Sequence, residues 1–278
     1  MSLFGELIDD DALLGGARLS TLAALVERHL GYRRQWFAPM LGRLAVPDRE
    51  LAQVSRLLPG GTGLGVTVIN TGGAGGLIAL AHRTIPGLAI EAVESPLRDL
   101  DDLESNAARV VAAAAELPEG IDIYVELPYV PGWQAAAELV EAEGLLGKIR
   151  IDGGQGGQLA SAEQVADQLS VLIEGDLPFS AAGLDRAWPG DPSGLETPTR
   201  HGLLSLLAAV EALIDGAEQP DAVNLLQAGD HDKIVATIGG WDTATQDRVR
   251  RRLRSVSCRQ VPDLIDDLVA VGLLAPPT

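Results

Sequence analysis

The sequence predicts an α/β protein whose parallel strands form a TIM-barrel-like barrel, either regular or irregular. Between residues 64 and 216, five apolar strand patterns are each followed by a helical pattern. Such alternation is typical of parallel strands joined by right-handed helical crossovers. No linker divides the chain, so we expect one domain over residues 1–278. An open doubly wound parallel sheet is the alternative arrangement of the same elements.

Residues 1–60 are predicted to form a helical extension before the barrel-like body at residues 64–278. The stretch LSTLAALVERHL has apolar residues at helical spacing, and Ser20 can cap this helix. The stretch VPDRELAQVSRLL carries Pro47 at a first-turn position, where proline is favoured. The following LPGGTG then ends the second helix.

The body and the tail divide into elements by the period of their apolar residues. Strand patterns occupy residues 64–70, 88–94, 121–128, 148–152 and 177–183, and helical patterns occupy 77–83, 97–117, 132–144, 161–175 and 200–216. In the tail, residues 221–240 form either a strand and a helix or two short helices. Residues 241–254 and 261–274 have helical patterns, and residues 255–258 are a late strand.

Composition narrows the classes of partner. The formal net charge is -18 over 278 residues, so the chain repels phosphate backbones and we expect no nucleic-acid partner. The single cysteine, Cys258, fits a reducing compartment. The chain begins without a signal-peptide pattern and has no apolar run of membrane-spanning length, so we expect a cytoplasmic protein with no membrane partner. A homo-oligomer is compatible with these features.

Charged residues follow one face of several predicted strands. Because side chains alternate along a strand, the apolar face meets the helices and the polar face points into the barrel. The inward set is Glu91, Tyr124, Glu126, Lys148, Arg150 and Ser180, with Glu94 and Asp152 at strand ends. Barrel enzymes place their chemistry at the carboxyl ends of the strands, which predicts a site at that mouth.

This constellation favours an enzyme of lyase, aldolase or isomerase type that acts on a small anionic carboxylate or phosphate metabolite. We expect Glu91 or Glu126 to hold Lys148, which would be either a Schiff-base nucleophile or an electrostatic anchor. Glu126 would be the acid/base, and Arg150, with its planar fork, would clamp the anion. Two alternatives remain open for the same residues. They are a structural ion-pair network inside the barrel and a divalent metal held by Glu94, Glu126 and Asp152, although the adjacent cations favour no metal.

Other candidate residues lie in the connections. His201 begins a helix, where a neutral imidazole can polarise a carbonyl group, so it is a third catalytic candidate. Asp185 and Arg186 open a long loop rich in Pro and Gly, and long loops after barrel strands often cover a site. The full substrate-binding prediction is Arg150, Asp152, Glu91, Glu94, Tyr124, Ser180, Asp185 and Arg186.

Two glycine loops follow strand patterns and are candidates for anion binding at helix starts. They contain Gly72, Gly73, Gly75 and Gly76 in the first loop, and Gly153, Gly154, Gly156 and Gly157 in the second. Neither completes G-x-G-x-x-G, because Ile78 and Leu159 occupy the third glycine positions. We therefore expect no dinucleotide and no other cofactor, and tight strand-to-helix turns are the alternative role for these glycines.

The stretches LPFSAAGLDR, TRHGLLSLLAAVEAL and SVSCRQVPDLIDDLVAVGLL resemble a largely actinobacterial family of bacterial proteins with α/β-barrel architecture and no established activity. The resemblance covers roughly residues 147–274. The positions that match are Lys148, Arg150, Gly153, Gly154, Gly183, Leu184, His201 and Gly202. Ser180 stands where the family has a lysine, and Asp185 and Arg186 stand where it has two histidines. These departures favour a rival function, a non-catalytic ligand-binding or assembly protein on a degenerate barrel.

Overall fold

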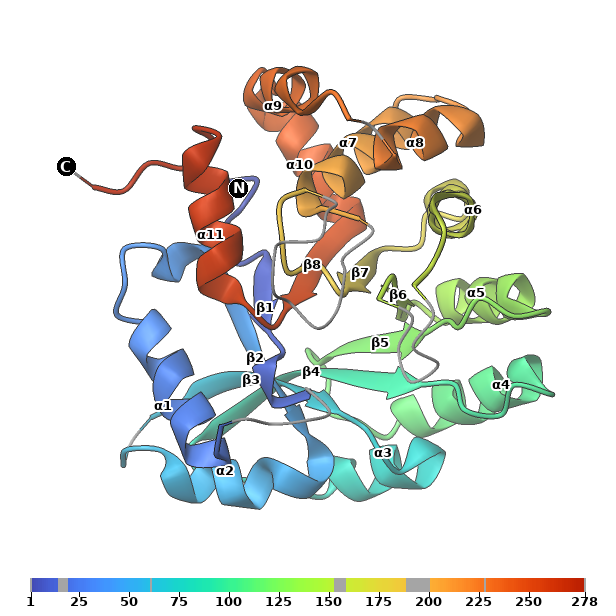
Figure 1. Ribbon diagram of the computed structural model, residues 1–278. Coiled ribbons are helices and arrows are strands. Elements are labelled where there is room, and N and C mark those ends of the chain that lie inside the picture. Colours follow the sequence, from blue (N-terminus) through green and yellow to red (C-terminus); the bar gives the residue numbers. More distant parts are fainter. Residues whose placement is uncertain are drawn as a thin grey trace.

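The computed structural model describes residues 2–14, 20–60, 62–152, 159–188, 201–227 and 229–277. Eight parallel strands form a closed barrel in sequence order, with helices around it, which confirms the TIM-barrel-like α/β fold and excludes the open sheet (Figure 1). The strands are β1 (Ile8–Asp10), β2 (Leu41–Pro47), β3 (Leu64–Ile69), β4 (Leu88–Pro96), β5 (Asp122–Glu126), β6 (Leu146–Arg150), β7 (Phe179–Ala182) and β8 (Leu253–Cys258).

The expectation of a helical extension over residues 1–60 is wrong, because this segment supplies β1 and β2. β1 pairs with β2 on one side and with β8 on the other, so it is the strand that closes the barrel. Two of its three residues are aspartates, which conceals the apolar pattern of a strand. The expected boundary between residues 1–60 and 64–278 therefore falls inside the barrel, between β2 and β3, and does not separate an extension from a body.

Helices cover the outside of the strands. They are α1 (Leu22–Tyr32), α2 (Leu51–Leu57), α3 (Gly73–Ala81), α4 (Leu103–Ala114), α5 (Trp133–Ala142), α6 (Ala162–Glu174), α7 (Leu203–Ile214), α8 (Gln219–Leu226), α9 (His231–Gly239), α10 (Thr243–Arg252) and α11 (Val261–Ala270). Short 3-10 turns lie at Ala12–Leu14, Ala38–Met40 and Asp48–Glu50. The start of α6 shows local specification, since Ser161 and Gln164 form a reciprocal capping box.

The main apolar core lies between the strands and these helices. Val125 of β5, Ile149 of β6 and Val140 of α5 are fully buried in one continuous apolar cluster. Each such side chain stabilises the fold by about 1.5–3 kcal/mol through its removal from water. Because this outer face takes the aliphatic residues, the inner face of the strands is free to carry polar ones.

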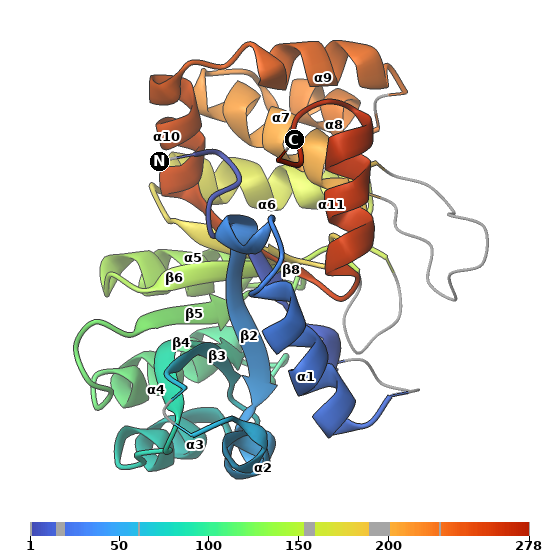
Figure 2. The ribbon, with the colours of Figure 1, turned by 90° about the vertical axis from the view of Figure 1, so that its left-hand side faces the viewer.

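The described part of the connection from β7 to β8 holds four helices instead of one. Helices α7 to α10 gather on one side of the barrel, at the top of Figure 2. α7 packs against α6, α8, α9 and α10, and every residue from 203 to 210 in it is buried. Residues 221–240 therefore form two short helices, and residues 255–258 belong to a strand as predicted. Within the described ranges, no helix combines the length and the apolar character needed to cross a membrane.

Candidate active site

A β-bulge in β4 decides which glutamate reaches the barrel interior. Val66 pairs with Ile90 and Thr67 pairs with Ala92, so Glu91 is the extra residue between them. The bulge shifts the alternation by one position, and Glu94 then points inward. Glu91 instead pairs with Arg43 of β2 at 3.2 Å and its side chain is 50% exposed, so the expectation that Glu91 could hold Lys148 is wrong.

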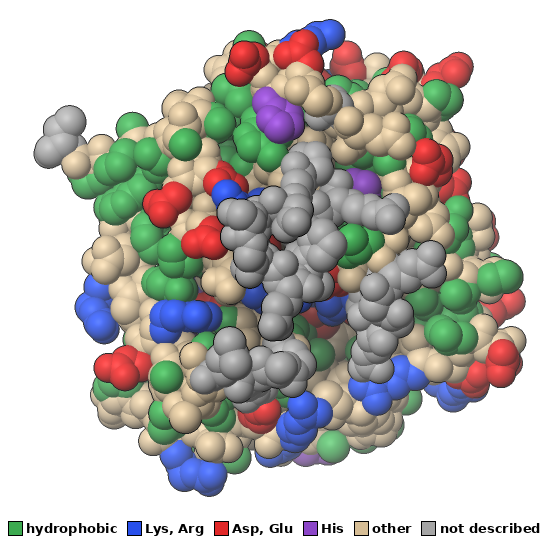
Figure 3. Space-filling model, viewed as in Figure 1, with side chains coloured by type: hydrophobic (Ala, Val, Ile, Leu, Met, Phe, Trp, Pro, Cys, Tyr) green, Lys and Arg blue, Asp and Glu red, His purple; other side chains and the backbone are tan. Residues whose placement is uncertain are grey.

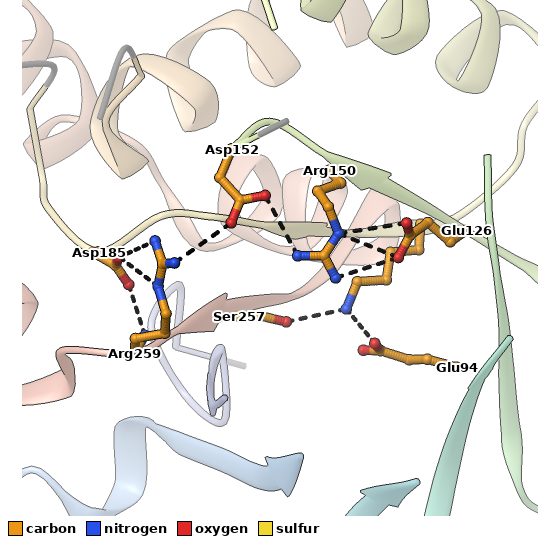
Figure 4. A network of polar contacts seen from close by, with 8 residues as sticks. Glu94, Glu126, Arg150, Asp152, Asp185, Ser257 and Arg259 are labelled. Carbon is orange, nitrogen blue, oxygen red and sulfur yellow. Dashed lines mark hydrogen bonds and ion pairs between the residues drawn. The ribbon is translucent and has the colours of Figure 1, made fainter. Parts of the chain in front are cut away.

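Lys148 of β6 is a fully buried cation inside the barrel. Its Nζ atom is in ion-pair contact with Oε2 of Glu94 on β4 and donates to Oγ of Ser257 on β8 at 3.2 Å (Figure 4). The partner is therefore Glu94, and neither of the glutamates expected from the sequence. Since β4 and β8 are not adjacent to β6, these contacts establish that Lys148 crosses the interior.

Arg150 lies two residues after Lys148 on the same face of β6, at the C-terminal rim of the barrel. Its guanidinium faces Glu126 at 3.3–3.4 Å and Asp152 at 3.4 Å (Figure 4). These distances exceed the 2.7–2.9 Å typical of charge-assisted hydrogen bonds. Burial lowers the pKa of Arg150, but the Glu126 and Asp152 carboxylates outweigh it and raise the pKa above the ordinary value. Arg150 is thus a fixed positive charge with loosely held partners.

A second, tighter pair completes the rim. Asp185, after β7, accepts hydrogen bonds from the Arg259 side chain at 2.7 and 2.9 Å and from its backbone N–H at 2.7 Å. Asp152 lies between the two arginines, 3.8 Å from Nη1 of Arg259. Gly183 permits Asp152 to lie this close to the end of β7, because Gly183 has a φ of +93° and a Cβ there would lie 2.5 Å from Cβ of Asp152.

The sequence contains a rim carboxyl that the prediction missed. Asp11 follows β1 directly, and its backbone N–H donates to the Cys258 carbonyl at 3.0 Å, which continues the pairing with β8. Burial, followed by the nearby Asp185 charge, raises the pKa of Asp11 to about 8. The signal was the run of three aspartates after Leu7 and Ile8, which marks the carboxyl end of a short strand.

The three consecutive aspartates take different positions. Asp9 is buried inside the barrel, where its Oδ1 accepts the Arg43 backbone N–H at 2.6 Å and burial raises its pKa. Asp10 faces outward and meets Nδ1 of the buried His29 of α1 at 3.0 Å. Only Asp11 belongs to the C-terminal mouth, so strand alternation sorts three identical residues into three environments.

Two other predicted substrate-binding residues lie deeper in the barrel or toward its opposite end. Tyr124 belongs to a polar group with Arg43 and Asp122, and burial, followed by the Asp122 charge, raises its pKa to about 12. Ser180 is buried, and its hydroxyl has no hydrogen-bond partner among the described residues. Neither side chain forms a hydrogen bond or ion pair with Arg150 or Arg259 in the described part of the chain, so their substrate-binding role stays a prediction.

Two loop candidates serve to join elements. Nε2 of His201 donates to the Ala160 carbonyl at 2.9 Å, which links the start of α7 to the segment before α6. Arg186 donates to both carboxylate oxygens of Asp267 in α11 at 2.7 Å. The geometry of both residues fits a structural link, and their predicted roles at the substrate remain untested.

The first glycine loop is a tight turn whose hydrogen-bond donors are already bound to side chains of this protein, among them the Asp48 carboxylate. The Thr71 N–H and hydroxyl donate to the Asp48 carboxylate at 2.8 and 2.5 Å, and the Gly72 N–H donates to Asn70 Oδ1 at 3.0 Å. A Cβ at Gly76 would collide with that same Asn70 oxygen. This geometry favours the turn role for Gly72, Gly73, Gly75 and Gly76. The second loop, Gly153, Gly154, Gly156 and Gly157, lies outside the described residues.

The carboxylates that could hold a metal are engaged with cations. Glu94 contacts Lys148, while Glu126 and Asp152 face Arg150. In the described part of the chain, no group of three or more His, Cys, Asp or Glu side chains is arranged to hold a metal ion. No known family profile matches the sequence, and no curated protein shows significant similarity to it.

Proposed function

We propose that the protein is an imine-forming enzyme of lyase, aldolase or isomerase type that acts on a small anionic carbonyl metabolite at the C-terminal mouth. The observation that carries this proposal is the fully buried Lys148 in contact with Glu94 inside the barrel. Barrel interiors are ordinarily filled by branched aliphatic side chains. A buried ion pair is often no more stabilising than such residues, so a chemical role explains its presence better than stability does.

Lys148 and Glu94 form a complete pair for nucleophilic attack on a carbonyl. Glu94 takes one proton from the Lys148 ammonium, which frees the amine lone pair. The amine then adds to the carbonyl carbon, and the carbonyl π electrons move to oxygen. Loss of that oxygen as water takes two protons, one returned by Glu94 and one from the added nitrogen, and leaves an iminium that withdraws electrons from the adjacent carbon. Ser257 holds the amine in place through its 3.2 Å contact.

Arg150 is the residue suited to an anionic substituent of the substrate. It lies two residues after Lys148, and its contacts with Glu126 and Asp152 are long enough to be exchanged for a substrate carboxylate or phosphate. Arg259 is less suited, because Asp185 holds it at 2.7 Å. We assign to Glu126, once it is released from Arg150, the role of the base for the carbon next to the iminium.

Borohydride trapping tests the proposal directly, because Lys148 and Lys233 are the only two lysines in the sequence. The protein is incubated separately with pyruvate and dihydroxyacetone phosphate, reduced with sodium borohydride, and mapped by peptide mass spectrometry. We expect one reduced adduct on Lys148 that is absent in Lys148→Met. The exposed Lys233 is the internal control for non-specific reaction. Absence of a Lys148 adduct with both compounds would refute the imine chemistry.

A second candidate is the non-catalytic ligand-binding or assembly protein. It is favoured by the balance of charge at the mouth, where three cations (Lys148, Arg150 and Arg259) meet four carboxylates (Glu94, Glu126, Asp152 and Asp185). Charges of both signs are likewise interspersed on the face seen in Figure 3. Under this candidate, the ion pairs only stabilise the barrel and neither compound is trapped.

A further inference from the structure

Asp11 is a buried carboxyl group at the mouth of the barrel, and one of its oxygens is available to a ligand. The residue is 4% exposed, yet its Oδ1 atom has no hydrogen-bond partner among the described residues. A buried carboxyl oxygen without a hydrogen-bond partner destabilises the folded protein, because its interactions with water are lost and not replaced. Such atoms in a folded protein call for a specific explanation, and a bound substrate oxygen is one.

The charged side chains with the largest influence on the pKa of Asp11 belong to the candidate active site. They lie on three strands or directly after them. Lys148 and Arg150 belong to β6, Asp185 follows β7, and Arg259 follows β8. Cys258, the last residue of β8, lies beside Asp11 as well. Asp185 disfavours the ionised form of Asp11, while the three cations favour it. Burial of the Cys258 thiol raises its pKa, so this neighbour is neutral.

Desolvation is the largest influence on Asp11 and outweighs the cations. The resulting pKa of about 8 leaves a proton on the carboxyl at neutral pH. The other mouth carboxylates face cations directly, at Glu94, Glu126, Asp152 and Asp185. Asp11 therefore differs from them in having both a proton to donate and an oxygen that no other described residue contacts through a hydrogen bond.

We propose that Asp11 is the catalytic residue that exchanges a proton with the carbonyl oxygen and nitrogen during imine formation at Lys148. This inference rests on the proposed function. As the C–N bond forms, the carbonyl oxygen takes the Asp11 proton, and the added nitrogen then returns one proton to the Asp11 carboxylate. Glu94 supplies the proton that leaves with the hydroxyl group as water. Asp11 ends protonated and Glu94 ends ionised, so the cycle balances.

The test follows the rate of imine formation by mixing the protein with pyruvate or dihydroxyacetone phosphate and quenching into sodium borohydride at timed intervals. Asp11→Asn keeps the volume of the side chain, and we expect it to slow adduct formation about 100-fold at pH 7, which is the scale of general acid catalysis. The wild-type rate should fall as pH rises through about 8, and Asp11→Asn should lack that limb. Asp122→Asn, at the other end of the barrel, is the matched control.

A second variant separates chemistry from folding. Asp11→Ala leaves a space that formic acid can enter, so added formate should restore the trapping rate in Asp11→Ala but not in Lys148→Met. Equal rates and equal pH profiles in wild type and Asp11→Asn would overturn the role of Asp11 while the imine chemistry stands. Absence of any adduct in the wild type would overturn both. A rate lost in Asp11→Ala that formate does not restore would assign Asp11 to structure alone.

Discussion

Removal of the buried cation has a consequence for stability that does not depend on catalysis. Lys148→Met preserves the length of the side chain but leaves Glu94, whose side chain is 5% exposed, without its counter-charge. Breaking a buried ion pair in this way costs about 3–5 kcal/mol, because the remaining charge is desolvated and uncompensated. Glu94→Met should cost a similar amount for the reverse reason. The double variant exchanges the pair for two apolar side chains, so it should recover most of the summed loss and unfold close to the wild-type midpoint.

The assay is urea unfolding followed by far-UV circular dichroism, with the four proteins compared as a double-mutant cycle. Arg248→Met provides the matched control. Arg248 pairs with Glu211 and Asp215 at 3.9 and 3.5 Å, and its side chain is 39% exposed. A solvent-exposed pair of this kind contributes about 0–1 kcal/mol, so this variant should unfold close to the wild-type midpoint.

The reasoning would be refuted by additive, small effects. If Lys148→Met and Glu94→Met each cost less than about 1 kcal/mol and their effects add within about 0.5 kcal/mol, the two groups are not a desolvated ion pair. The interior of the barrel would then be hydrated at Lys148, and the physical basis for its selection as the nucleophile would be lost.

Three further predictions concern the rim. The pKa of Asp11 is raised to about 8 in the folded protein from an unfolded value near 3.8. Its contribution to the free energy of unfolding is therefore complete below pH ~4 and is lost as pH rises toward 8, by up to ~1.4 kcal/mol per pH unit. Urea unfolding at several pH values should show this decline in the wild type and not in Asp11→Asn. Gly183→Ala should destabilise the protein more than Gly216→Ala, since the φ values are +93° and +92° but only the Gly183 methyl would meet Asp152, and the difference in urea midpoint isolates that contact. Arg150→Gln should raise the pyruvate concentration for half-maximal trapping by about tenfold or more, whereas an unchanged concentration would exclude an anion clamp at this position.

The sequence by itself determined the fold class and the inward placement of two cations. Alternation of strand and helix patterns over residues 64–216 was sufficient for parallel strands with helical crossovers, because each period is a local property of the chain. The same period-two rule placed Lys148 and Arg150 on the interior face of β6. It also placed Glu126, Arg150 and Asp152 toward the carboxyl ends of their strands, and the structure brings these three residues together at the rim.

Only the tertiary structure decided which groups meet Lys148. The bulge at Glu91 depends on how β4 aligns with β3, and one added residue reverses the direction of every later side chain in the strand. β1 is too short and too acidic to be recognised until it is seen between β2 and β8, and Asp11 reaches the mouth only through that pairing. Lys148 and Ser257 are 109 residues apart in the chain. Contacts across a closed barrel depend on the registers of all its strands together, and no local pattern contains that information.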